Sequence, residues 1–362
     1  MDKSIGEQFF SLFRCCIACL MDGSFRSVQA AAANELVVQG WGGTKSEAEK
    51  KAFFDPFTKE TGIKIIPVEA GGDLWGKVAA QVNSKNIEWD LVSGFDYSGT
   101  RAAGEKGLLE KIDYAIVTRA KELVSGSMRE WGMGQELNTV CIAYNYKKFT
   151  GDKYPKSWAD IFDVKKFPGP RAMNNFGAHN YNILAALLAD GVPPDKLIPM
   201  DMDRAFKKLD QIKSSVKLWY TSGSQLQQGL MSEEVTLGAV FDGRTLVAIS
   251  DGAPVKLNFN QGLFMINYWA VVKGAPHKEA ALKFLNFICR PEQQAIFSSI
   301  IKYSSANPKF IQSIPADKQK DYVVHPDNFK GIIPITSDKD IDWLAKNDAM
   351  ITERWNAWLS KK

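Results

Sequence analysis

The sequence has few of the residues on which common enzyme and metal sites depend. It contains only three histidines in 362 residues (His179, His277 and His325), and no two of them have the spacing of a zinc site. No GxSxG motif is present, which argues against a serine hydrolase of that type. The Gly40–Ser46 segment has threonine where a phosphate-binding loop needs glycine before its lysine. We therefore expect no catalytic residue, no metal and no cofactor.

Cysteine is also scarce, and most of it lies near the N-terminus. Three of the five cysteines fall within the first 21 residues, which leaves only Cys141 and Cys289. One disulfide between them stays open, but isolated cysteines of this kind are more often buried thiols, and we expect both to be free. The formal net charge of +4 is small and mixed along the chain, so it gives no basis for a nucleic-acid partner. After residue 33, no segment approaches the roughly 20 apolar residues of a membrane span.

The first 33 residues have the order of an export signal. Lys3 and Arg14 precede a short apolar run, Cys15–Met21, and small residues follow as far as the Ala30–Ala33 cluster. Positive, apolar and small segments in that order are typical of a secretory signal that is cleaved within such a cluster. Because Arg14 interrupts the apolar part, an internal helix stays open, and Cys19 leaves a lipid-anchored form open. We expect a periplasmic protein that begins after residue 33.

The rest of the chain alternates between strand-like and helix-like patterns. Runs rich in β-branched residues alternate with segments whose apolar residues recur at helical spacing. The expected strands are Glu35–Gly40, Ile63–Val68, Trp89–Val92, Thr139–Tyr144, Lys217–Trp219, Thr236–Phe241, Val255–Asn258 and Tyr268–Val272. The expected helices are Lys45–Thr61, Leu74–Val82, Ala178–Ala189, Met202–Ile212, Leu226–Met231, Arg244–Ser250, Lys278–Cys289, Pro291–Ile301 and Ile341–Trp358. This order predicts an α/β fold with mixed, mostly parallel sheets flanked by helices, and the length predicts two lobes.

Residues suited to recognition gather in the loops that follow the expected strands. In open α/β sheets, ligands bind beyond the carboxyl ends of the strands, where glycines allow close approach and polar side chains orient the ligand. The loop residues that we expect to bind are Trp41, Gly42, Gly43, Phe95, Asp96, Tyr97, Asp242, Arg244, Asn267 and Trp269. Structural alternatives stay open for three of them: Trp269 as a core anchor, Asp242 as a helix N-cap and Arg244 in a surface salt bridge. Trp158 and Trp219 are expected to pack.

Five segments resemble the bacterial extracellular solute-binding proteins of the polyamine-binding type. In order along the chain, they are Leu36–Gly43, Trp89–Val92, Ser157–Phe162, Leu237–Gly243 and Ala280–Glu292. The resemblance implies the two-lobed, type II periplasmic-binding-protein fold, with a hinge formed by the strands that cross between the lobes. It implies one lobe at residues 34–142 and 268–325, a second at residues 143–267, and a C-terminal helical segment at residues 326–362 that docks on the lobes.

The resemblance also implies partners and a function. The protein would be the monomeric, periplasmic component of an ABC importer, and its partners would be the permease and ATPase subunits. It would capture a small molecule by hinge closure of the two lobes. The residues that fall where the family lines its cleft are Trp41, Tyr97, Phe241, Met265, Asn267 and Tyr303.

The expected pocket departs from a polyamine site in its charge. Polyamine binders generally place an aspartate at the position of Asn267 and further acids near Ala178, whereas residues 171–189 contain no Asp or Glu here. Buried ammonium groups need carboxylate partners, and Arg244 at a helix N-terminus suits a carboxylate instead. The interpretation is a hydrophilic, carboxylate-bearing nitrogenous ligand, such as an opine. Its hydroxyls would meet an amide-rich wall of Asn174, Asn175, His179, Asn180 and Tyr181.

Two alternatives stay open. The ligand of the first is spermidine or putrescine, for which Asp96 and Asp242 would be the only nearby carboxylate anchors. The second is a cysteine-dependent enzyme, because some enzymes use the same two-lobed scaffold with a cysteine nucleophile. Cys141 lies near the first crossover, although we can name no base for it.

Overall fold

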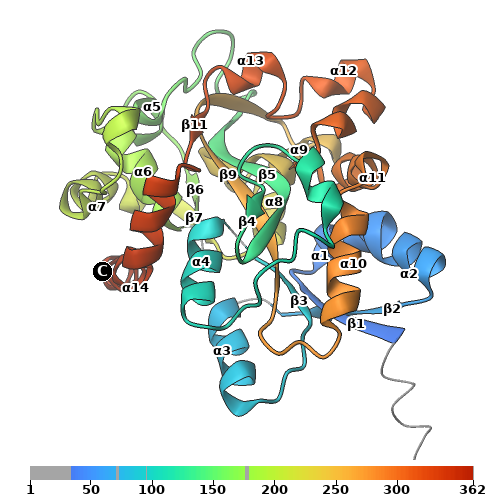
Figure 1. Cartoon of the computed structure of the whole chain (residues 1–362). Helices are drawn as coiled ribbons and strands as arrows, with labels where there is room; N and C mark the ends of the chain where they lie inside the picture. Colours follow the sequence, from blue (N-terminus) through green and yellow to red (C-terminus); the bar gives the residue numbers. More distant parts are fainter. Residues whose placement is uncertain (1–33, 71–72, 95, 176–178, 362) are drawn as a thin grey trace, which may run out of the picture.

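The computed structural model describes residues 34–70, 73–94, 96–175 and 179–361. These residues form helices around a single mixed sheet (Figure 1). The export signal expected at residues 1–33 lies outside the described residues, and so does Phe95. No helix in the part of the chain that is described has the length and apolar character needed to cross a membrane.

The strand order divides the sheet into two half-sheets joined by two long strands. The order is β2-β1-β3-β9-β5-β8-β6-β7. The first half-sheet consists of three parallel strands, β1 (Glu35–Gly40), β2 (Lys64–Glu69) and β3 (Leu91–Ser93). The second half-sheet also consists of three parallel strands, β6 (Arg171–Asn174), β7 (Val216–Tyr220) and β8 (Leu237–Phe241). The short strands β4 (Met128–Arg129), β10 (Ser304–Ser305) and β11 (Ile333–Pro334) add to the central pair.

The central pair, β5 (Gly132–Asn145) and β9 (Val255–Val271), belongs to both half-sheets. The two strands are antiparallel, with irregular register between Gly134 and Glu136 and again between Val140 and Ile142. The C-terminal end of β9 pairs with β3, and the C-terminal part of β5 pairs with β8. Both strands therefore cross from one half-sheet to the other.

The length of these crossing strands differs from the prediction. Val255–Asn258 and Tyr268–Val272 are not separate strands, because β9 is one strand of 17 residues. Likewise, β5 begins at Gly132 rather than at Thr139, and β6 was not predicted at all. Every residue of β5 is buried. A strand covered on both faces loses the alternation of apolar and polar residues, so its polar first half resembles a loop in the sequence.

Helices flank the two half-sheets (Figure 1). Beside the first are α1 (Gly43–Glu49), η2 (Lys50–Phe54), α2 (Asp55–Thr61), α3 (Leu74–Ser84), α4 (Tyr97–Glu105), η3 (Thr118–Glu122), α10 (Lys278–Ile288) and α11 (Pro291–Ile301). Beside the second are α5 (Trp158–Phe162), α6 (His179–Ala189), η4 (Pro194–Lys196), α7 (Met202–Asp210), η5 (Lys213–Ser215), α8 (Gly223–Met231) and α9 (Asp242–Ser250). The C-terminal part adds η6 (Pro308–Ser313), α12 (Ala316–Gln319), α13 (Pro326–Phe329) and α14 (Asp338–Ser360).

The core confirms the packing roles predicted for several residues. Trp158 is fully buried, and Trp219 packs edge-on against the last helix. Trp269 is also fully buried, stacks edge-on with Phe284 and donates its indole N–H to Gln135. It is therefore a core anchor rather than a wall of the pocket.

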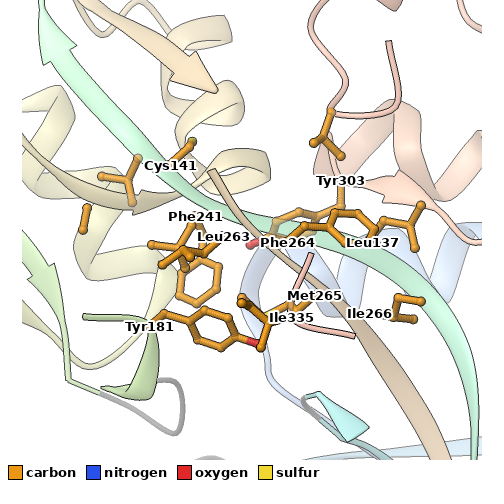
Figure 2. Close-up of a cluster of buried hydrophobic side chains, with 14 of the residues drawn as sticks. Leu137, Cys141, Tyr181, Phe241, Leu263, Phe264, Met265, Ile266, Tyr303 and Ile335 are labelled. Atoms are coloured by element: carbon orange, nitrogen blue, oxygen red, sulfur yellow. The ribbon is translucent and has the colours of Figure 1, made fainter. Parts of the chain in front are cut away.

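The two cysteines of the described chain are free, buried thiols, as predicted. Cys141 lies in the apolar cluster around β5 and β9 (Figure 2). Cys289 packs its sulfur against that of Met133, 3.4 Å away.

Helix α14 contacts elements of both half-sheets. At its N-terminal end, Asp342 pairs with Arg101 of α4. Towards its C-terminus, Trp355 packs on Trp219 of β7 and donates its indole N–H to Asn175 at 2.9 Å. In Figure 1 the helix, drawn in red, lies beside α4 and near α6. Helix α14 therefore packs against both half-sheets, while the boundaries of the two lobes and of the C-terminal segment at residues 326–362 stay a prediction.

Trp355→Ala is expected to destabilise the protein by roughly 3–5 kcal/mol, since it removes a fully buried indole from this interface. The free energy of unfolding from urea denaturation measures the effect. Asn356→Ala is the matched control, because Asn356 is exposed on the next position of the same helix. Equal stability of the two variants would show that α14 is not held by Trp355.

Candidate functional site

The loops at the carboxyl ends of the parallel strands converge between the two half-sheets. A Cβ placed on Gly43, at the start of α1, would lie 3.3 Å from Ser224 Oγ, in the first turn of α8. We call the region where these loops meet β5 and β9 the junction. At another point of the junction, Tyr181 Oη of α6 donates to Asp96 Oδ2, at the start of α4 beside the first half-sheet, at 3.2 Å. The two sides are therefore in direct contact through the residues that follow the strands.

The turn from β1 into α1 depends on two adjacent glycines. Gly42 and Gly43 have φ values of 77° and 61°, a conformation that residues with a Cβ seldom adopt. In addition, a Cβ on Gly42 would lie 2.9 Å from Glu69 Oε2. The turn lets α1 start directly at the junction, which places the next residues of the helix against β5.

An ion pair is buried at this junction. Lys45 Nζ lies 2.8 Å from Glu136 Oε1, and the two side chains are 7% and 1% exposed. The same oxygen accepts a hydrogen bond from Asn267 Nδ2 at 2.9 Å and lies 3.4 Å from Asn138 Nδ2. Glu136 thus links α1 to the two crossing strands.

A second carboxyl group, that of Glu49, is buried one helical turn after Lys45. Burial is the main reason why the pKa of Glu49 rises from 4.5 to about 8. Attraction to Lys45 opposes the rise, and repulsion from Glu136 adds to it. At neutral pH Glu49 is therefore mainly protonated and uncharged, and its O–H group is a potential hydrogen-bond donor.

Asp242 is the third buried carboxyl group. Its burial raises the pKa to about 7, although hydrogen bonds from backbone N–H groups oppose the rise. The expectation that Asp242 caps the next helix is wrong, because Phe241 is the N-cap and Asp242 is the first residue of α9. The carboxylate instead accepts a hydrogen bond from the backbone N–H of Thr139 in β5, at 3.1 Å.

Arg244 is buried in the first turn of α9. The residue is only 7% exposed. Its side chain lies over Gly223, where an added Cβ would lie 2.5 Å from Arg244 Nε. Among the described residues, Arg244 has no carboxylate partner within salt-bridge distance, and its Nη1 has no hydrogen-bond partner. The alternative that Arg244 forms a surface salt bridge is therefore wrong.

Several buried polar atoms at this junction have no hydrogen-bond partner among the described residues. They are Glu49 Oε1, Glu136 Oε2, Asn138 Oδ1, Thr139 Oγ1, Asp242 Oδ2, Arg244 Nη1 and Asn267 Oδ1. Each such group costs about 1–3 kcal/mol when it stays unpaired. Their concentration in one place contrasts with the rule that buried polar groups are paired, and it suits a polar molecule that both donates and accepts hydrogen bonds.

Apolar and aromatic side chains border this polar group. Figure 2 shows the ring of Tyr181 extending toward Met265 and Ile335, close to Phe241. The ring of Tyr303 packs on Gly243, where an added Cβ would lie 2.4 Å from it. The structure therefore brings Phe241, Met265 and Tyr303 close to Asp242, Arg244 and Asn267, and their role in binding stays a prediction.

Other predicted site residues have structural partners. Tyr97 packs against Tyr268 and under Arg129, and Asn175 accepts the hydrogen bond from Trp355. Asn174 donates to Asn182 at 3.0 Å. Trp41, which is half-buried, donates to the carbonyl of Ser93 at 2.7 Å.

His179 and Asn180, two residues of the predicted amide-rich wall, lie at the start of α6. His179 is the first residue of α6, but its side chain lies outside the description, as do residues 176–178. Asn180 is buried.

Five residues of this junction were not predicted from the sequence: Lys45, Glu49, Glu136, Asn138 and Thr139. Lys45 carried a signal, because a cation in the first turn of a helix is unfavourable unless it has a partner. Glu136 carried a weaker one, since Gln135 to Thr139 is a polar run directly before an expected strand. Neither signal reveals which carboxylate meets which cation.

Cys141 lacks the surroundings of a nucleophile. Its thiol is fully buried in β5, and burial raises its pKa well above the ordinary value. A thiol that stays protonated is a poor nucleophile. Within the described ranges, no group of three His, Cys, Asp or Glu residues is arranged to hold a metal ion.

Comparison with known proteins gives consistent matches. The model of the family described as bacterial extracellular solute-binding protein matches residues 52–323. A gamma-aminobutyric acid-binding protein of Pseudomonas aeruginosa is 31% identical over 93% of this chain and 94% of its own length. A spermidine/putrescine-binding periplasmic protein of Haemophilus influenzae is more distant, at 25% identity over 82% of each chain.

A solved structure extends the comparison to another ligand. The periplasmic binding protein MotA of A. tumefaciens B6, in complex with glucopine, has a TM-score of 0.81. It is 31% identical, and the match covers 90% of this chain and 99% of that one. The predicted family and the predicted two-lobed α/β fold are both confirmed.

Glu49→Gln is expected to reduce the loss of stability between about pH 5 and about pH 8. The unfolded chain releases the proton of Glu49 near pH 4.5, whereas the folded chain holds it to about pH 8. In this window the folded state binds more protons, so rising pH favours unfolding. Urea denaturation at a series of pH values measures the slope. Glu47→Gln, an exposed change on the same helix, is the control, and an equal slope in both variants would contradict the assignment.

Proposed function

We propose that this chain, which belongs to the bacterial extracellular solute-binding proteins, captures a small hydrophilic solute that carries both a carboxylate and an ammonium group. Two examples of solutes with this chemistry are ω-amino acids such as 4-aminobutyrate and opine-like conjugates of an amino acid. The solute would lie between the two half-sheets, at the junction of β5 and β9.

The observation that carries the proposal is the buried guanidinium of Arg244. It is 7% exposed and has no carboxylate partner among the described residues. A buried charge without a partner is strongly unfavourable, so a ligand carboxylate would stabilise it. Guanidinium groups bind carboxylates in a fork geometry, and the first turn of a helix favours an anion.

The charge balance of the junction supports the same class. Lys45 and Glu136 neutralise each other, and Glu49 is mainly protonated at neutral pH because its pKa is about 8. Asp242, with a pKa of about 7, is partly ionised and can accept from one ammonium group. The guanidinium of Arg244 and the carboxyl group of Asp242, which can lose its proton when a cation binds, complement a zwitterion. They complement a polyamine less well, because a polyamine brings two or more positive charges.

The relatives support the proposal. The name of one of them states that it binds gamma-aminobutyric acid, and the structure of another contains glucopine. Polyamine binding remains the second candidate, because Glu49, Glu136 and Asp242 provide three buried carboxyl groups and a more distant relative is named for spermidine and putrescine. Asp96 is a weaker anchor than the sequence suggested, since it caps α4 and accepts from Tyr181.

The wider role follows from the family. We propose that the protein works in the periplasm after removal or lipidation of residues 1–33, as the monomeric binding component of an ABC importer with permease and ATPase subunits. Closure of the two lobes would bury the solute, and we assign the hydrogen bond between Tyr181 and Asp96 and the close approach of Gly43 to Ser224 to the closed form. No catalytic step is part of this proposal.

A thermal-shift panel tests the ligand class. The chain from Asn34 is mixed with 4-aminobutyrate, glucopine, putrescine and spermidine in separate series. Binding to the folded state alone raises the melting temperature with concentration. We expect a shift with 4-aminobutyrate or glucopine and none with the polyamines. A shift with polyamines alone would contradict the proposal and establish the second candidate.

Arg244→Met is expected to weaken binding of the carboxylate-bearing ligand by about a hundredfold, since it removes the buried partner of that carboxylate. Isothermal titration calorimetry measures the affinity. Arg204→Met is the matched control, because Arg204 is an exposed arginine of α7 that pairs with Asp190. Unchanged affinity in Arg244→Met would show that the carboxylate does not bind at Arg244.

A further inference from the structure

Glu136 is a carboxylate in the middle of the proposed site, and one of its two oxygens is already fully used. Oε1 receives Lys45 Nζ at 2.8 Å and Asn267 Nδ2 at 2.9 Å, while Oε2 has no hydrogen-bond partner among the described residues. Glu136 is 1% exposed. A carboxylate in this position, next to Asn267, is the kind of group that would bind a ligand ammonium.

The cation that meets Glu136 comes from the protein itself. Lys45 is 5% exposed and reaches β5 from the first turn of α1, where a positive charge is unfavourable for the helix. Its ammonium group has the same chemistry as one end of a diamine. Lys45 therefore stands where a second ligand ammonium would need to be.

We propose that Lys45 is a specificity-determining residue. Its ammonium group forms an ion pair with Glu136, so this carboxylate is not available to a second ammonium group of a ligand, and diamines and polyamines are excluded. A diamine that entered the site would have to displace Lys45 from Glu136 or place a second cation beside it, and like charges in a buried site repel strongly. A zwitterion avoids this conflict, since it brings one ammonium and a carboxylate for Arg244. This inference rests on the proposed function and adds the residue that sets the preference.

The neighbouring groups agree with this role. Glu49, which follows Lys45 by one helical turn, is buried and has an oxygen without a partner among the described residues. Removal of the Lys45 charge would leave Glu136 without its ion-pair partner, and Arg244 would remain as the protein cation near Glu49. The variant site would then keep three buried carboxyl groups, those of Glu49, Glu136 and Asp242, with one protein cation fewer.

The test compares two ligands of similar length, 4-aminobutyrate and 1,4-diaminobutane, by isothermal titration calorimetry. For the natural sequence we expect binding of the amino acid and no measurable binding of the diamine. For Lys45→Met we expect measurable diamine binding, with an affinity at least about tenfold above the detection limit that the natural sequence does not reach, because a buried carboxylate gains a cationic partner. Lys51→Met, at an exposed position of the same helical run, is the matched control and should not gain diamine binding.

A double variant identifies the carboxylate. In Lys45→Met/Glu136→Gln the carboxylate is removed together with its partner, so the gain of diamine binding should be lost. If Lys45→Met fails to fold because Glu136 loses its partner, Lys45→Gln takes its place, since glutamine keeps a hydrogen-bond donor toward Glu136 without the charge.

The outcomes separate this inference from the proposed function. A folded Lys45→Met or Lys45→Gln variant without any gain of diamine binding overturns the role of Lys45, and so does an equal gain in the double variant. Absence of 4-aminobutyrate and glucopine binding in the natural sequence overturns the proposed ligand class alone. Diamine binding by the natural sequence overturns the role of Lys45, and it overturns the proposed ligand class as well if neither 4-aminobutyrate nor glucopine binds.

Discussion

The buried ion pair between Lys45 and Glu136 connects the parts of the molecule on which the site depends. Glu136 lies on β5, Lys45 comes from the helix after β1, and Asn267 of β9 donates to the same carboxylate oxygen. Because removing one partner of a buried ion pair is strongly unfavourable, the pair holds α1 against both crossing strands through Oε1 of Glu136. The two glycines before Lys45 make that position accessible, because they start the helix at the end of β1.

Other contacts join the two half-sheets near the Lys45–Glu136 ion pair. Tyr181 and Asp96 form a hydrogen bond across the junction, and α14 contacts both sides through Asp342 and Trp355. The unpaired polar atoms at the junction lie beside these contacts. A solute that satisfied those atoms would favour the closed arrangement by as much as it binds that arrangement better than an open one.

The sequence predicted the α/β fold, the family and part of the site, because those depend on local patterns. Trp41 to Gly43, Asp242 and Arg244 follow strands that are visible as β-branched runs, and their loops do converge. Glu136 could not be predicted, since it lies on a strand buried on both faces, whose polar residues look like a loop. The roles of Lys45, Trp269 and Asn175 depend on partners far away in the sequence, Glu136, Gln135 and Trp355, and no local pattern identifies them.

The decisive experiment is a crystal structure of the chain grown with 4-aminobutyrate or glucopine. We expect the ligand carboxylate to lie within hydrogen-bonding distance of the Arg244 guanidinium. We also expect the ligand amine to lie near Asp242, with Lys45 still paired to Glu136. A ligand bound away from the junction of β5 and β9, or a ligand carboxylate bound without Arg244, would contradict the proposed binding mode.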